Sequence, residues 1–106
     1  MNIKFRYQYR DGANYKNHGK IIFTNNFNLS IEEITKRITN RLISGEFFYS
    51  DQFGVTDLHF EKWDNEYDHL WHEFVDVEKT DELNDQDDIK EFIERLEQKI
   101  TLYPTE

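Results

Sequence analysis

The sequence predicts a small α+β domain, in which one antiparallel sheet of four strands carries two helices packed on one face. Three observations predict it. The N-terminal residues alternate between apolar and polar, two later stretches space their apolar residues as helices do, and the elements follow the order β-β-α-β-β-α. Two hairpins, each followed by a helix, pack most simply as one sheet covered on one side. The 106 residues fit a single domain, 1–106.

The first hairpin begins the chain. From Ile3 to Arg10, apolar and polar residues alternate strictly, which is the pattern of a half-buried strand. Residues 11–19 are rich in turn formers and predict a long loop. The β-branched run from Lys20 to Thr24 predicts the second strand.

The first helix has the clearest start signal in the chain. Ser30 and Glu33 form a capping-box pattern, in which each side chain can bond the other residue's backbone N–H. Apolar residues then recur at helical spacing from Ile31 to Leu42. Gly45 is placed where a left-handed residue commonly ends a helix.

The second half predicts another hairpin and another helix. Residues 46–54 read as a connection with four aromatics, followed by a strand from Val55 to Lys62 or Trp63 and a turn at 64–66. A fourth strand is expected from Tyr67 or His69 to Val77, although a helix over 67–79 is the alternative. An acidic connection, 78–86, is expected to be mobile. Asp85 is then expected to cap a last helix that runs to about Ile100.

The open face of this sheet is where a site is expected. A three-residue turn at 64–66 would set the strand register, and a slip of one residue would change every partner. With that register the open face carries two Trp, one Tyr, two His and three carboxylates, namely Asp57, His59, Glu61, Trp63, Tyr67, His69, Trp71 and Glu73.

Three interpretations of this set remain open. The side chains can simply stabilise the sheet as cross-strand pairs. The aromatic group of Trp63, Tyr67 and Trp71 can dock a partner or a second copy of the chain. Alternatively, His59 and His69 with Glu61 or Glu73 can ligate a divalent metal or act as acid and base, although no fixed-spacing metal motif is present.

Charge and composition exclude several functions. The net charge of −9 argues against general binding to nucleic acid or to anionic membranes. Residues 1–53 carry eight Lys or Arg against five acids, whereas residues 54–106 carry five against seventeen. The absence of Cys excludes disulfides and thiolate sites and fits a reducing compartment. The N-terminus has no apolar signal-peptide core, so a cytoplasmic protein is expected. No phosphate-binding or cofactor motif is present, and no cofactor is expected.

The sequence therefore predicts a small acidic binding or adaptor domain without catalysis. Small acidic, cysteine-free domains of bacterial type can neutralise a basic partner, such as a nuclease toxin, in the manner of an inhibitor or immunity protein. The expected partner-binding residues combine the aromatic group with the acidic C-terminal surface and are Trp63, Tyr67, Trp71, Asp81, Glu82, Asp85 and Asp87. The alternatives are a metal-dependent or acid–base enzyme using His59, His69 and Glu73, and a self-associating structural protein that forms a homodimer.

Overall fold

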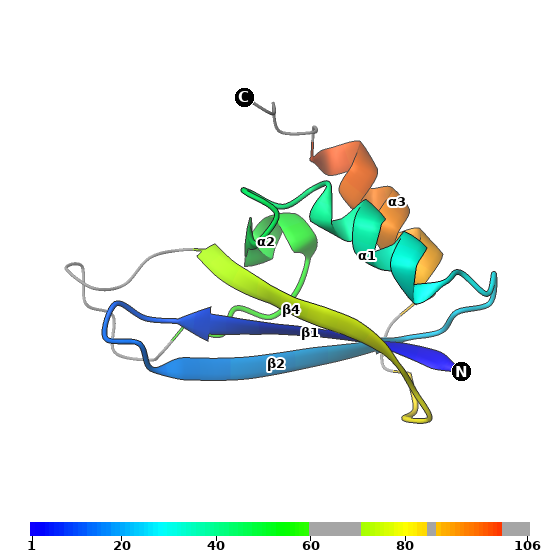
Figure 1. Cartoon of the computed structure of the whole chain (residues 1–106), viewed down its shortest axis with the longest axis horizontal. Coiled ribbons are helices and arrows are strands. Elements are labelled where there is room, and N and C mark those ends of the chain that lie inside the picture. Colours follow the sequence, from blue (N-terminus) through cyan, green and yellow to red (C-terminus); the bar gives the residue numbers. More distant parts are fainter. Residues whose placement is uncertain (60–70, 85–86, 101–106) are drawn as a thin grey trace.

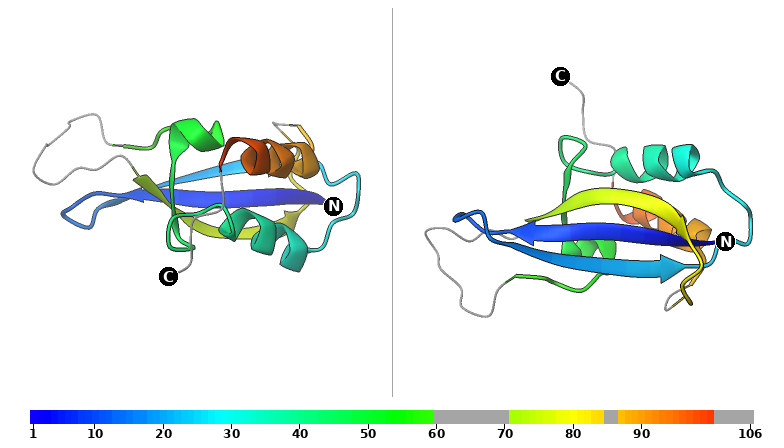
Figure 2. Two further views of the ribbon diagram at one scale, coloured as in Figure 1. Left: turned by 90° about the horizontal axis from the view of Figure 1, so that it is seen from above. Right: turned by 60° about the horizontal axis from the view of Figure 1, so that its bottom comes forward.

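Four strands form one antiparallel sheet in the order β2-β1-β4-β3 (Figure 1). The computed structural model describes residues 1–59, 71–84 and 87–100. The elements along the chain are β1 (Asn2–Arg10), β2 (Lys16–Phe23), α1 (Ile31–Thr39), β3 (Phe47–Tyr49), α2 (Ser50–Phe53), β4 (Trp71–Thr80) and α3 (Ile89–Lys99). The helices lie on one side of the sheet, and turning the molecule brings the strands to the front (Figure 2).

The predicted α+β class and the four-stranded antiparallel sheet are confirmed, but the strand predicted from Val55 is wrong over residues 55–59. The turn predicted at 64–66 lies outside the described residues. Residues 55–59 form no strand, and β4 pairs instead with β1 and with β3. The connection expected at 46–54 contains both β3 and the short helix α2. The alternative of a helix is excluded for residues 71–79, because they lie within β4. The strand β2 begins at Lys16, four residues before its predicted start.

The core lies between the sheet and the helices, and Phe5 is at its centre. The odd-numbered residues of β1 from Ile3 to Tyr9 are all buried, as the alternation predicts. The Phe5 ring lies 5.6–6.4 Å from five other aromatic rings, which come from β1, β3, α2, β4 and α3. The sheet and the helix layer therefore both pack against Phe5.

A bulge in β4 adjusts the register against β1. Arg6 pairs with Asp76 and Tyr7 pairs with Phe74, so Val75 has no partner on β1. An extra residue of this kind bends the strand and shifts its alternation. As a result, Phe74 contacts the core cluster on one side of the bulge while Asp76 faces Arg6 on the other.

The helix α1 begins where predicted and ends earlier. The backbone N–H of Glu33 donates to the Ser30 hydroxyl over 3.1 Å, so Ser30 is the N-cap. The helix stops at Thr39, and Gly45 does not end it. Gly45 is left-handed, but it serves with Ser44 in the tight turn that leads into β3.

The cap of α3 is Asp88, and the prediction that Asp85 caps this helix is wrong. One Asp88 carboxylate oxygen accepts from the Lys90 backbone N–H, while the other accepts from the Thr24 hydroxyl and the Asn26 backbone N–H, at 2.7–3.0 Å. Residue 85 itself lies outside the described residues. Asp88 thus starts the helix and also joins it to the chain that follows β2.

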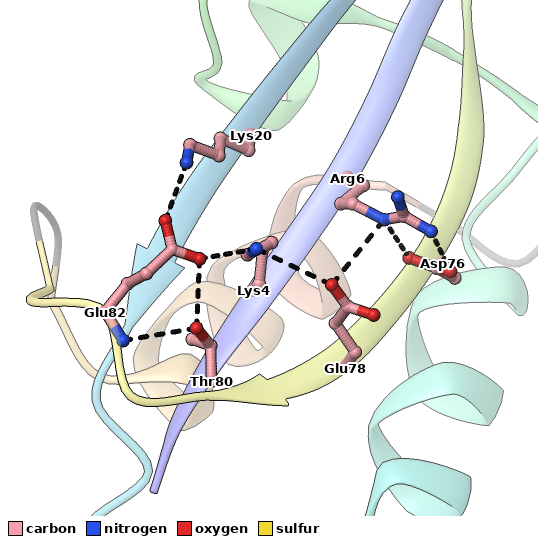
Figure 3. A network of polar contacts seen from close by, with 7 residues as sticks. All are labelled: Lys4, Arg6, Lys20, Asp76, Glu78, Thr80 and Glu82. Carbon is pink, nitrogen blue, oxygen red and sulfur yellow. Dashed lines mark hydrogen bonds and ion pairs between the residues drawn. The ribbon is translucent and has the colours of Figure 1, made fainter.

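Ion pairs cover the open face of the sheet near the N-terminal end of β1 (Figure 3). Arg6 donates two hydrogen bonds to Asp76, at 2.5 and 2.7 Å. The Glu82 carboxylate contacts Lys4 and accepts from Lys20 over 2.6 Å, so it links β1 to β2. The acidic connection therefore begins only after Thr80, which ends β4, and Glu82 within it is bound across the strands.

We expect Glu82→Gln to destabilise the protein in a pH-dependent way. Hydrogen bonds from Lys20 and Lys4 lower the pKa of Glu82 to about 2 from its usual 4.5. A carboxyl group with a lowered pKa in the folded state stabilises the fold above its usual pKa, and this stabilisation disappears as the pH falls. Urea unfolding should show a stability difference from wild type at pH 7 that shrinks between pH 4.5 and about 2. The matched control is Asp81→Asn, an exposed neighbour. An equal stability difference between wild type and Glu82→Gln at pH 7 and at about pH 2 would contradict this role of the Glu82 carboxylate.

None of the helices in the described part of the chain has the length and apolar character that a membrane crossing requires.

Candidate functional site

Three aromatic side chains share the open face where β3 pairs with β4. Phe48 lies opposite His72, and both are buried on the helix side, where their rings lie 5.8 Å apart. Because side chains alternate along a strand, the neighbouring residues Phe47, Tyr49 and Trp71 face the other way. Trp71 lies directly opposite Tyr49 and is 39 % exposed. This part of the open face therefore presents three aromatic side chains.

These side chains and one from the preceding turn form a shallow apolar groove of about 310 Å³. It is named here the Trp71 groove, and its lining residues are Ile43, Phe47, Tyr49 and Trp71. Ile43 is held beside β3 by two backbone hydrogen bonds with Phe47, of 2.7 and 3.0 Å. The turn between them needs two left-handed residues, which Ser44 and Gly45 provide with φ of 55° and 71°.

A second hollow, of about 280 Å³, adjoins the groove. It is named here the acidic pocket, and its lining residues are Tyr49, Ser50, Asp51, Gln52 and Asp57. Tyr49 lines both hollows, so the apolar groove on the open face and the acidic pocket on the helix side meet at the edge strand β3. Asp51 comes from the first turn of α2 and Asp57 from the segment that follows it.

The segment 55–59, which carries Asp57, is held against three strands. The Tyr7 hydroxyl donates to the Thr56 carbonyl over 2.8 Å, and the Leu58 N–H donates to Nε2 of His72 over 2.9 Å. Asn17 of β2 donates to the Leu58 carbonyl. Gly19 makes this approach sterically feasible, since a Cβ there would lie 2.9 Å from Leu58 and from the Tyr7 ring.

Asp57 lies between two histidines. Its carboxylate is 2.9 Å from Nδ1 of His59 and 3.4 Å from Nε2 of the buried His72. Partial burial raises the pKa of Asp57, but hydrogen bonds from the backbone and side chain of His59 outweigh it and bring the pKa below its usual value. Asp57 is therefore ionised at neutral pH. Nε2 of His72 accepts the Leu58 N–H over 2.9 Å, so this nitrogen takes part in holding the segment.

The predicted partner-binding residues have different surroundings. Trp71 lines the groove, Asp81 is exposed, Glu82 is bound to Lys4 and Lys20, and Asp87 lies 3.4 Å from Arg95. Trp63, Tyr67 and Asp85 lie outside the described residues. Of the predicted residues that the structure describes, only Trp71 lines the groove.

The residues predicted as metal ligands are not brought together where they are described. Glu73 is on the open face, 2.6 Å from Gln8 and 3.3 Å from Arg10. His59 follows the segment that is bonded to Tyr7 and His72 on the helix side. The predicted register, which placed both on the open face, is therefore wrong for His59. His69 lies outside the described residues, and among those described no three His or carboxylate groups form a metal site.

Sequence reasoning missed most of the site. Phe47 and Tyr49 alternate with the buried Phe48, but a three-residue strand is too short for a period of two to be convincing. Ser44 and Gly45 were the available signal, because a small residue followed by Gly after an apolar residue suits a tight turn. The sequence position of Gly45 was interpreted as the end of α1 instead.

Comparison with known protein families, with curated proteins and with solved structures finds no match.

Proposed function

We propose that this chain is a small non-catalytic domain that binds a basic partner protein, as an inhibitor or immunity-type protein does. The observation that carries the proposal is the Trp71 groove. It offers aromatic side chains at the surface, and aromatic residues are the usual anchors of protein interfaces.

The charge of the chain supports a basic partner. The chain carries 22 acidic and 13 basic residues, so it attracts cationic surfaces at long range. Near the groove, Glu46, Asp51 and Asp57 are exposed carboxylates. Ion pairs engage Lys4, Arg6 and Lys20 at the other end of the sheet. The surface around the groove therefore favours a partner of opposite charge, and association should weaken as salt is added.

We expect Trp71→Ala to weaken partner binding without unfolding the protein. The partner is first captured from an extract of the source cell and purified, and its affinity is then measured by calorimetry. Loss of a central aromatic anchor typically weakens binding by about 30-fold or more. The matched control is Val75→Ala, an exposed apolar residue of the same strand that does not line the groove. Equal affinity of Trp71→Ala and wild type, or an affinity that ignores salt between about 0.05 and 0.5 M, would contradict the proposal.

A further inference from the structure

The acidic pocket beside the Trp71 groove indicates which side chain of the partner binds there, an inference that rests on the proposed function. The two hollows share Tyr49, so a partner that occupies one has the other within reach. Their chemistry differs sharply. The groove is lined by apolar side chains, whereas the pocket contains two carboxylates, a hydroxyl and an amide.

Hydrogen bonds to the surrounding strands and within α2 fix the residues that line the acidic pocket. Three hydrogen bonds with β1, β2 and β4 hold segment 55–59, and the Asp57 carboxylate accepts the backbone N–H of His59 over 2.9 Å. Asp51 is fixed by its place in the first turn of α2, where its carboxylate accepts the N–H of Gln52. Both carboxylates are therefore held in position before a ligand arrives, which reduces the entropy lost on binding.

The two carboxylates lack a Lys or Arg partner within the described ranges. Asp57 contacts only histidines among the basic side chains there, and Asp51 forms no ion pair there. An anionic ligand would be repelled by both groups. A cationic one would gain charge-assisted hydrogen bonds, and the adjacent Tyr49 ring offers an aromatic face to a guanidinium.

We propose that the partner places an Arg or Lys side chain in the acidic pocket while an apolar side chain of the same segment occupies the Trp71 groove. The ligand is thus a protein segment with a basic residue close to an aromatic or aliphatic one. Arg is the better fit because its planar guanidinium can bond a carboxylate with two N–H groups and stack on an aromatic ring.

A peptide-display selection on the immobilised full chain tests this directly. Random peptides are selected in parallel on wild type, Asp51→Asn and Trp71→Ala. The Asn side chain keeps the oxygen that accepts the Gln52 N–H, so the variant removes charge with little structural change. Asp81→Asn removes the same charge from an exposed residue outside both hollows and is the matched control.

Wild type and Asp81→Asn should enrich peptides in which Arg or Lys accompanies an apolar residue. A synthetic Arg peptide from that set should bind Asp51→Asn about three- to fivefold more weakly, whereas its Gln counterpart should bind both proteins alike. Enriched peptides that bind at Trp71 without a basic residue would overturn this inference and leave the proposed function standing. The same peptides enriched on wild type and on Trp71→Ala, or no enrichment on wild type, would overturn both.

Discussion

Replacing Phe5 with Ala should remove a large part of the stability of this protein. Phe5 is fully buried, and its ring contacts aromatic rings from five different elements. Truncation of a buried Phe to Ala typically costs about 3–5 kcal/mol, because apolar burial is lost and a cavity remains. Small domains have only about 5–15 kcal/mol in total. Urea unfolding monitored by Trp fluorescence should show a midpoint far below that of wild type.

The control for this prediction is Phe27→Ala, which removes the same side chain from the surface. Phe27 is 59 % exposed, and its described ring contact is with the Lys90 ammonium, 4.0 Å from the ring centre. A cation–π contact at such a site is worth about 0.5–1 kcal/mol. If the two variants unfolded at similar urea concentrations, Phe5 would not be the centre of the core.

Asp88→Ala is expected to cause the second-largest loss of stability, of about 2–4 kcal/mol. Its carboxylate caps α3 and also accepts hydrogen bonds from Thr24 and Asn26, so one substitution leaves three donors without their acceptor. Loss of a cap alone costs about 1 kcal/mol, and the other donors left unsatisfied at this part-buried site add to it. The same urea experiment measures the change.

Two further variants separate the hydrogen bonds that Asp88 accepts from the effect of its negative charge. Asp88→Asn keeps an oxygen acceptor at the cap and should lose clearly less stability than Asp88→Ala. Asp87→Ala removes an exposed neighbour whose contact with Arg95 is 3.4 Å long, and it should change the stability by no more than about 0.5 kcal/mol. An Asp87→Ala variant as unstable as Asp88→Ala would show that general charge, not the cap, stabilises α3.

Local patterns in the sequence were enough to predict the elements that depend on local physics. The alternation of β1, the Ser30 cap of α1 and the apolar stripe of α3 each involve neighbouring residues only, and the structure contains all three. The pairing of β4 was not predictable in the same way. It depends on which distant strand competes best for each edge, and the sequence contains no local signal for the β1–β4 and β3–β4 pairs.

The candidate site also combines features that depend on neighbouring residues with features that depend on long-range pairing. Trp71 was predicted on the open face through an assumed hairpin register. That register is not formed over residues 55–59, but alternation with the buried His72 along β4 still directs Trp71 to the open face. Its neighbours in the groove could not be predicted, since Tyr49 reaches Trp71 only through the pairing of β3 with β4. Asp57 was expected on the open face as part of a strand. Side-chain hydrogen bonds from Tyr7 and to His72 hold its segment on the helix side instead, and such long-range bonds leave no periodic trace in a sequence.

The position of β1 within the sheet also affects how the chain folds as it is made. Among the described strands β1 is synthesised before the others, and one of its two partners, β4, ends only at Thr80. Until then, the β1 edge of the nascent β1–β2 hairpin that later pairs with β4 is unpaired, and the face of Ile3, Phe5, Tyr7 and Tyr9 is uncovered. Such edges and faces are the surfaces that chaperones protect from aggregation during translation. The last helix, α3, then covers a sheet that is already complete.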